Sequence, residues 1–194
     1  MTEVSIQDTL DTSDCRELGD KAVWSLSTAK PGNGIEQVRD DNLETFWQSD
    51  GTQPHYLNIQ FLRKTSISKI SFYIDYNLDE SYTPKKISIR SGSSMHDLLD
   101  LTAIDLHEPI GWVSISLNNS MVSNSTEDIS TNASHNALRT HLLQIQVHTM
   151  HQNGRDTHIR QIKIFGPRPI PIVMGNFPLT AFQTIEMSQF ALLR

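Results

Sequence analysis

Apolar side chains recur at every second position in several separate segments of this chain. Leu57, Ile59 and Phe61 alternate with the polar residues Asn58 and Gln60. The same alternation is found in five further segments: 70–74, 87–89, 113–117, 143–147 and 162–164. Successive side chains of a strand point to opposite faces, so period two indicates sheets that are buried on one face. With no long apolar helix between these segments, we expect an all-β protein, an antiparallel β-sandwich or jelly roll.

The size and charge of the chain narrow its class further. Its 194 residues suffice for one domain with a core and for tails. The formal net charge of −6 argues against a general binder of nucleic acid or anionic membranes, which would show a basic field, although it leaves room for a local basic patch. No run of the sequence approaches the roughly 20 apolar residues of a membrane span.

The only cysteine, Cys15, excludes an intramolecular disulfide. The first eight residues lack the charged and then apolar pattern of a secretory signal. We therefore expect an intracellular, reducing compartment, and we interpret three Asn-x-Ser/Thr matches in one polar stretch as chance.

Composition divides the chain into three parts. Residues 1–17 form a polar N-terminal arm, in which Asp14 to Glu17, followed by a glycine, predicts a short capped helix. Residues 18–166 form the sandwich domain. Within it, residues 118–138 are rich in Ser, Asn and Thr and poor in large apolar groups, so we expect a flexible insertion there.

The third part is a tail over residues 167–194. Its proline-rich start cannot continue a sheet ladder, because proline lacks the N–H group, so the sandwich should end near Phe165. Seven large apolar side chains follow: Phe177, Leu179, Phe182, Ile185, Met187, Phe190 and Leu193. Such a tail either packs back on the domain or docks elsewhere.

Four histidines lie close together in the sequence and raise the question of a metal site: His141, His148, His151 and His158. Strand alternation, however, places the first two on opposite faces. No cysteine pair and no His-Glu-x-x-His helix accompanies them. We expect polar surface roles, with no metal and no cofactor.

Catalytic motifs are also missing from the sequence. There is no Gly-x-Ser-x-Gly, no phosphate loop and no dinucleotide fingerprint, and Cys15 has no evident base beside it. We therefore expect a non-catalytic protein.

Three loops rich in charge and aromatic groups are candidate binding loops: residues 40–51, 75–84 and 151–158. In the first, Trp47 offers a large anchor, with Ser49 and Asp50 as a polar rim. The third loop lies between two predicted strands, and Asn153-Gly154 would turn a hairpin there. Each loop alone is also consistent with an ordinary hydrogen-bonded turn. Together, at one end of a sandwich, they favour a peptide or sugar site.

Five motifs give the chain a family resemblance: Ala22-Val-Trp-Ser-Leu-Ser27, Arg39-Asp-Asp-Asn-Leu-Glu-Thr45, Trp47-Gln-Ser-Asp-Gly51, Asp79-Glu-Ser-Tyr-Thr-Pro84 and His151-Gln-Asn-Gly-Arg-Asp-Thr-His158. Together they resemble the Doc-domain subunits of the anaphase-promoting complex (cyclosome), from about Leu18 to Phe165. The segment from Asp41 to Ser49 is also similar to the galactose-binding-like superfamily, which includes discoidin-type lectin domains. The resemblance implies a galactose-binding-like jelly roll.

It also implies a non-catalytic function in a cell-cycle ubiquitin ligase. Doc subunits form a joint receptor for the destruction box with a β-propeller co-activator and promote processive ubiquitination, which controls mitotic exit and G1. The family's substrate-binding positions correspond here to Asn153, Gly154, Arg155, Asp156 and His158, and those of the facing loop to Ser81 and Tyr82. The expected location is the nucleus and cytoplasm.

The family ends in a short Ile-Arg tail that docks on a tetratricopeptide-repeat subunit. This chain ends in Leu193-Arg194, which keeps the arginine and replaces Ile by Leu at similar volume. The alternative hypothesis is a discoidin-type carbohydrate-binding module. The lone cysteine and the absence of a secretory signal argue against it, because such modules are usually secreted and often carry disulfides. A catalytic ubiquitin-transfer protein is disfavoured because its only possible thioester nucleophile would be Cys15.

Overall fold

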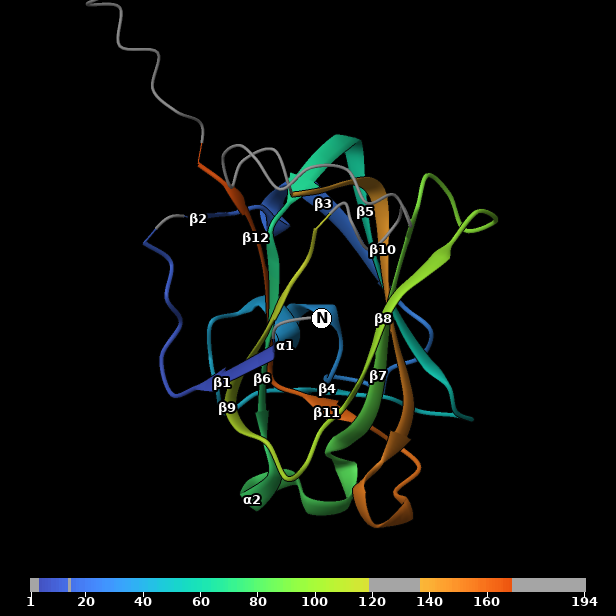
Figure 1. Cartoon of the computed structure of the whole chain (residues 1–194). Helices are drawn as coiled ribbons and strands as arrows, with labels where there is room; N and C mark the ends of the chain where they lie inside the picture. Colours follow the sequence, from blue (N-terminus) through green and yellow to red (C-terminus); the bar gives the residue numbers. More distant parts are fainter. Residues whose placement is uncertain (1–3, 14, 119–136, 169–194) are drawn as a thin grey trace, which may run out of the picture.

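The fold is a sandwich of two five-stranded antiparallel sheets, seen side-on in a computed structural model of the chain (Figure 1). The structure describes residues 4–13, 15–118 and 137–168. The sheets face each other across one apolar core, and short helices lie at one end. The predicted all-β, antiparallel sandwich is confirmed.

The first sheet has the strand order β1-β9-β6-β12-β2. Its strands are β1 (Val4–Gln7), β9 (Ile110–Ser116), β6 (Lys69–Asp75), β12 (Gln161–Pro167) and β2 (Cys15–Glu17). Strand β12, from the end of the domain, lies between β6 and the N-terminal β2.

The second sheet has the order β3-β5-β10-β7-β8. Its strands are β3 (Ala22–Leu26), β5 (His55–Ile67), β10 (Leu138–Met150), β7 (Pro84–Gly92) and β8 (Leu99–Asp105). The two 13-residue strands, β5 and β10, pair along most of their length, with Ile59 opposite Leu143. Their register shifts between Thr140 and Leu142.

The core lies between the sheets and is built from the alternating residues. Ile59 and Ile145 of one sheet and Phe72 and Ile164 of the other are 0% exposed. Burying such a side chain contributes about 1.5–3 kcal/mol. The six strands predicted from alternation are confirmed as β5, β6, β7, β9, β10 and β12.

The short helix predicted at the end of the N-terminal arm is wrong. Residues Cys15–Glu17 form strand β2, which pairs with the end of β12 and supplies the outer edge of the first sheet. Leu18, next along the chain, is 1% exposed. Sheet pairing and burial of this leucine outweigh the local capping signal. Strand β1 pairs with β9, so the N-terminal segment contributes to both edges of that sheet.

The end of the sandwich lies two residues beyond the predicted one. Strand β12 continues to Pro167, which lies opposite Cys15. The last partner of β12 on the β6 side is Lys69, opposite Phe165. A proline is compatible with this position because β12 no longer pairs with β6 beyond Phe165.

Two predicted segments fall mainly outside the described residues. Of the insertion predicted over 118–138, residues 119–136 are not described. The three that are described are ordered: Asn118 bridges Ala137, and β10 begins at Leu138. The tail is not described beyond Arg168, so its predicted docking residues Leu193 and Arg194 lie outside as well.

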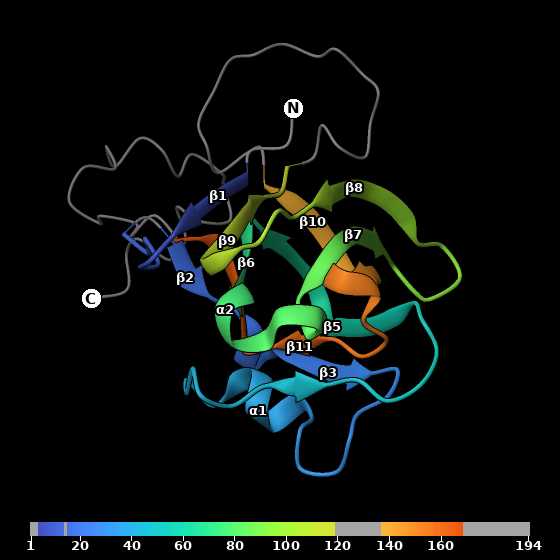
Figure 2. The ribbon, with the colours of Figure 1, turned by 90° about the horizontal axis from the view of Figure 1, so that it is seen from below.

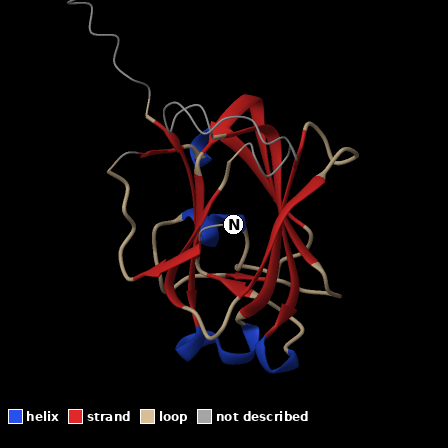
Figure 3. Cartoon of the chain, in the orientation of Figure 1, coloured by secondary structure: helices blue, strands red, loops and turns tan. Residues whose placement is uncertain are grey.

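Short helices gather at one end of the sandwich (Figure 3). They are α2 (Tyr76–Asp79), η2 (Glu80–Tyr82) and η5 (His151–Asn153). A further helix, α1 (Ile35–Arg39), a turn at η1 (Gly19–Lys21) and a small sheet of β4 (Trp47–Gln48) with β11 (His158–Ile159) complete the fold. No helix in these described parts is long and apolar enough to cross a membrane.

Candidate functional site: a loop cluster at the helical end

The segment His151–His158 connects the two sheets and is not a hairpin. Strand β10, before it, belongs to the second sheet, and β12, after it, belongs to the first. Gln152 and Asn153 adopt left-handed conformations, with φ of 51° and 58°. Gly154 has a φ of −57°. Gln152 and Asn153 therefore form the turn, one residue earlier than the predicted Asn-Gly turn. This turn leads the chain from the second sheet to the first.

Gly154 is required by a close approach between two loops. A Cβ atom at position 154 would collide with the carbonyl oxygen of Ser81. The φ of Gly154 suits any residue, so space is the constraint at this position. Two predicted binding loops, about 70 residues apart in the sequence, are thus packed backbone against backbone (Figure 2).

Three hydrogen bonds anchor the backbone of this crossing segment. The amide of His151 donates to the carbonyl of Thr83 at 2.9 Å. The side chain of Gln53 donates to the carbonyl of Gly154 at 2.7 Å. The His55 ring nitrogen Nε2 lies 2.7 Å from the carbonyl of Arg155. With its backbone so anchored, the segment can present side chains on a rigid support.

We call residues 40–51, 75–84 and 151–158 the loop cluster. His158 lies inside it, where the residue is 8% exposed. Its ring is stacked between Phe46 and Tyr82, with centroid distances of 4.1 and 4.2 Å. Its Nδ1 lies 3.0 Å from Oδ1 of Asp79. His158 therefore supports Tyr82 through this stacking, and its substrate contact stays a prediction.

Asp79 is the centre of a buried ionic cluster. Its carboxylate, 4% exposed, accepts hydrogen bonds from Nε of Arg160 at 2.9 Å and from Nη2 at 2.8 Å. The third nitrogen, Nη1, donates to the carbonyl of Leu43 at 2.8 Å. This two-point geometry is the strongest form of the Arg–carboxylate interaction. The Asp79–Arg160 interaction connects α2 with the residue just before β12 and, through Leu43, with the 40–51 loop.

Asp79 and Arg160 each stabilise the charged form of the other. Burial would raise the pKa of Asp79, but the hydrogen bonds from His158 and Arg160 and the charges of these groups outweigh it, so the pKa lies below its ordinary value. Burial opposes the charge of Arg160 too, yet Asp79 raises its pKa. His151 differs, since burial and the nearby Lys85 lower its pKa and favour the neutral ring.

Three of the predicted contact residues lie at the surface. Asn153 and Arg155 are exposed on the crossing segment, and Tyr82 is 38% exposed on the facing one. Asp156 is half-buried and pairs with Lys30 at 3.4 Å. The two facing loops therefore expose an amide, a guanidinium and a phenol.

The predicted rim is wrong for two of its three residues. Trp47 is 0% exposed, and its indole donates to the carbonyl of Thr28 at 2.9 Å. Ser49 is also 0% exposed and accepts from the amide of Thr157 at 2.8 Å. An aromatic residue in a polar stretch suggested a surface anchor, but here it fills the core beneath the loops. Asp50 is exposed as predicted.

The four histidines do not converge. His148 binds Ser88 on the second sheet at 2.8 Å, His141 lies farther along the same strand, and His151 packs edge-on against Tyr76. Among the described residues, no three His, Cys, Asp or Glu side chains are grouped so as to hold a metal. Cys15 is half-buried near Ser68.

Three side chains that hold the site together were not expected from the sequence. Asp79, Phe46 and Arg160 were not predicted as site residues. One signal was available for Arg160. It interrupts a run of core positions, with Ile159 and Ile162 on either side, and a charge at such a place needs a buried partner.

The family of the chain follows from comparison with known sequences. The family model described as "Anaphase-promoting complex, subunit 10" matches residues 3–189. This chain belongs to the anaphase-promoting complex subunit 10 family. It is thus a subunit of that complex, part of the cell-cycle machinery, and the predicted membership of the Doc group is confirmed.

Curated members of the subunit 10 family are similar over most of their length. Subunit 10 of Homo sapiens is 46% identical over 183 residues, which cover 94% of this chain and 90% of the relative. That of Drosophila melanogaster is 47% identical over 182 residues, covering 92% and 85%. Subunit DOC1 of Saccharomyces cerevisiae is 31% identical over 150 residues, covering 77% and 56%.

Solved structures with similar folds confirm the fold class. A family 32 carbohydrate-binding module of Clostridium perfringens, solved with galactose, superposes with a TM-score of 0.59 at 9% identity, covering 77% of this chain and 97% of the module. A second module of that organism, solved with a galactose-containing disaccharide, gives 0.60 at 8% identity, covering 78% and 100%. At such low identity the likeness is one of fold alone.

Proposed function

We propose that this chain is a non-catalytic, substrate-holding subunit of a ubiquitin ligase complex. It contributes the loop cluster to a joint receptor for the destruction box, together with a β-propeller co-activator. The observation that supports this most is the packing of Gly154 on Ser81, which locks two binding loops into one surface. We also propose that the protein acts in the nucleus and cytoplasm.

The exposed groups suit an extended peptide. Arg155 offers five donors for carboxylate or carbonyl groups, Asn153 offers a donor and an acceptor, and the ring of Tyr82 offers a flat apolar face. Each such polar contact contributes about 0.5–1.5 kcal/mol. A substrate held by several of them leaves more slowly, so more ubiquitin is transferred in each encounter. This would account for processive ubiquitination.

We further propose that Leu193 and Arg194 dock on a tetratricopeptide-repeat subunit. An apolar side chain beside a cation and a free carboxylate is a compact group that a helical-repeat groove can bind. In this arrangement the tail anchors the chain and leaves the loop cluster free. Deletion of the two residues should weaken assembly and leave the sandwich folded, as measured by co-purification with the complex.

The test of substrate holding removes exposed groups only. The double variant Asn153→Ala/Arg155→Ala should fold and assemble normally, because exposed side chains usually alter stability by only about 0.5 kcal/mol. It should bind a destruction-box peptide about tenfold more weakly, since two polar contacts of about 0.7 kcal/mol each are lost. In a single-encounter ubiquitination assay, the chains formed should be shorter.

A matched control variant is Gln60→Ala/Lys86→Ala. It removes one amide and one cation, both exposed, from the second sheet outside the loop cluster. This variant should retain wild-type chain lengths. If the loop variant, once shown to be incorporated, also gives the wild-type distribution, the loop cluster is not part of the receptor.

A further inference from the structure

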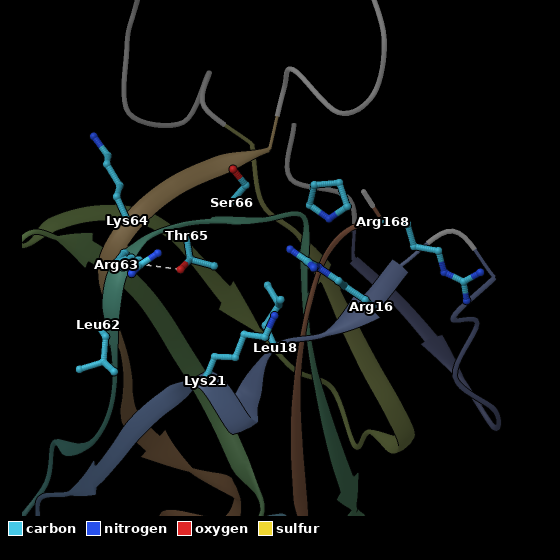
Figure 4. A pocket seen from close by; sticks show the side chains of 10 residues that line it. Arg16, Leu18, Lys21, Leu62, Arg63, Lys64, Thr65, Ser66 and Arg168 are labelled. Atoms are coloured by element: carbon cyan, nitrogen blue, oxygen red, sulfur yellow. Dashed lines mark hydrogen bonds between the residues drawn. The ribbon is translucent and has the colours of Figure 1, made fainter. Parts of the chain in front are cut away.

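A basic groove lies at the end of the sandwich opposite the loop cluster. Its volume is about 880 Å³, and it is lined by the end of β5, by β2 and η1, and by the end of β12 (Figure 4). Five of the lining residues are cationic: Arg16, Lys21, Arg63, Lys64 and Arg168. No lining residue is acidic. We call these ten lining residues the basic groove.

The cations of the basic groove have no carboxylate partner within residues 4–13, 15–118 and 137–168. Among the residues that the structure describes, none of the five forms an ion pair. Arg168 donates to the backbone carbonyls of Cys15 and Thr12, which fixes its position without involving a described carboxylate. In a chain of net charge −6, such a concentration of positive charge is a local exception.

The basic groove also has an apolar part. Leu62, which is 86% exposed, lines it together with Pro167 and the buried Leu18. The side chains of Arg63 and Lys64 extend from β5 near Leu62 (Figure 4). Their hydrocarbon stems add to the apolar surface while their charges face solvent.

We infer that the basic groove binds an acidic segment of a neighbouring protein in the complex, one that carries a leucine-like side chain between its carboxylates. The carboxylates would pair with the cations and the apolar side chain would contact Leu62. Nucleic acid is a poorer fit, because no lining residue is aromatic and no base could stack. An anionic membrane is also disfavoured, since the rest of the chain is acidic.

A short fluorescent peptide that alternates glutamate and leucine is a suitable probe for the full-length protein. The variant Arg63→Gln/Lys64→Gln should bind it about 3–10-fold more weakly, because two exposed ion pairs are lost. Leu62→Ser should weaken binding as well. Raising the salt concentration should lower the affinity further, since exposed charges are screened.

Two controls separate the basic groove from general charge effects. Lys85→Gln/Lys86→Gln removes the same charge from exposed positions on β7 and should bind the peptide like the wild type. A peptide with glutamine in place of glutamate should bind far more weakly. Equal loss in both double variants, equal binding of both peptides, or tighter binding of an oligouridylate RNA would overturn the inference.

The occupant in the assembled complex can be identified by cross-linking. A photoreactive leucine analogue at position 62 should form a cross-link to an acidic stretch of another subunit. Cross-links that map only to this chain's own residues 119–136 or 169–194 would show an internal occupant and refute the proposal. Destruction-box binding by the loop cluster would be unaffected in either case, so the two proposals are tested separately.

Discussion

The two ends of the sandwich use charged residues in opposite ways. At the helical end, Asp79 and Arg160 are buried and bound to each other, and the charge of Asp156 is paired with Lys30. At the other end, the five cations of the basic groove lie around open space without ion pairs to described residues. The buried pair fixes the conformation of the loop cluster, whereas the cations of the basic groove remain available to bind an anionic partner.

This difference shows which charged residues to test for binding. A buried, satisfied ionic cluster is costly to break, because either partner alone would be a buried unpaired charge. Loss of function on changing Asp79 or Arg160 would therefore report a disturbed loop structure. Exposed groups such as Arg155 or Lys64 report binding directly, since the fold does not depend on them.

The largest effect is expected for Asp79→Ala. The change leaves Arg160 and His158 buried without their carboxylate, which costs about 3–5 kcal/mol of stability. Chemical denaturation should show the loss. The matched variant Asp100→Ala removes the exposed partner of Arg90 and should cost at most about 1 kcal/mol. Equal losses in the two variants would remove the contrast between buried and exposed charge.

The buried Asp79–Arg160 pair should make the free energy of unfolding depend on pH in the acid range. The folded-state pKa of Asp79 is lowered, so its contribution is complete above the unfolded value of 3.8 and is lost as pH falls through the lower folded value. Asp79→Asn should therefore differ most from the wild type at neutral pH, and the difference should shrink below about pH 4. A constant difference across that range would exclude an ionised Asp79 as the cause.

Next in size is Gly154→Ala. The added methyl group would meet the Ser81 carbonyl and push the two loops apart, at a cost of about 1–3 kcal/mol. Destruction-box binding should weaken along with stability. Gly34→Ala is the control, because its nearest neighbour would be the Ala29 Cβ at 3.9 Å. Normal binding in a stable Gly154→Ala protein would show that the loops need not touch.

The smallest effect is expected in the basic groove. Arg63→Gln/Lys64→Gln removes two exposed neighbouring charges of like sign, so stability should stay within about 0.5 kcal/mol of the wild type. Thermal unfolding can measure this change beside that of Asp79→Ala. A large loss here would mean that the cations are structural, and the two ends would then be alike.

The alternation of apolar residues predicted the main strands because it records burial on one face directly. It could not predict β1, whose Val4 and Ile6 are 38% and 51% exposed, since pairing alone places that strand. It could not separate a hairpin from a crossing between sheets either. Both connect two strands by a short turn, and only the partners of β10 and β12 decide between them.

The candidate site was predicted in part. Motif positions identified the two loops, and the exposed Asn153, Arg155 and Tyr82 lie where a ligand could reach them. The same reasoning treated His158 and Trp47 as surface groups, although both are buried. Whether a loop residue is buried depends on which other segments of the chain pack against it, and residue type alone does not predict this packing.

The position of β12 between β6 and β2 has a consequence for synthesis on the ribosome. Strand β2 is made well before β12, its one sheet partner among the described residues, which follows about 150 residues later. At 5–20 residues per second, β2 must wait roughly 7–30 seconds before it can pair. An unpaired strand invites association with other chains during that interval. A nascent chain of this protein is therefore expected to need chaperone protection until β12 has left the ribosome.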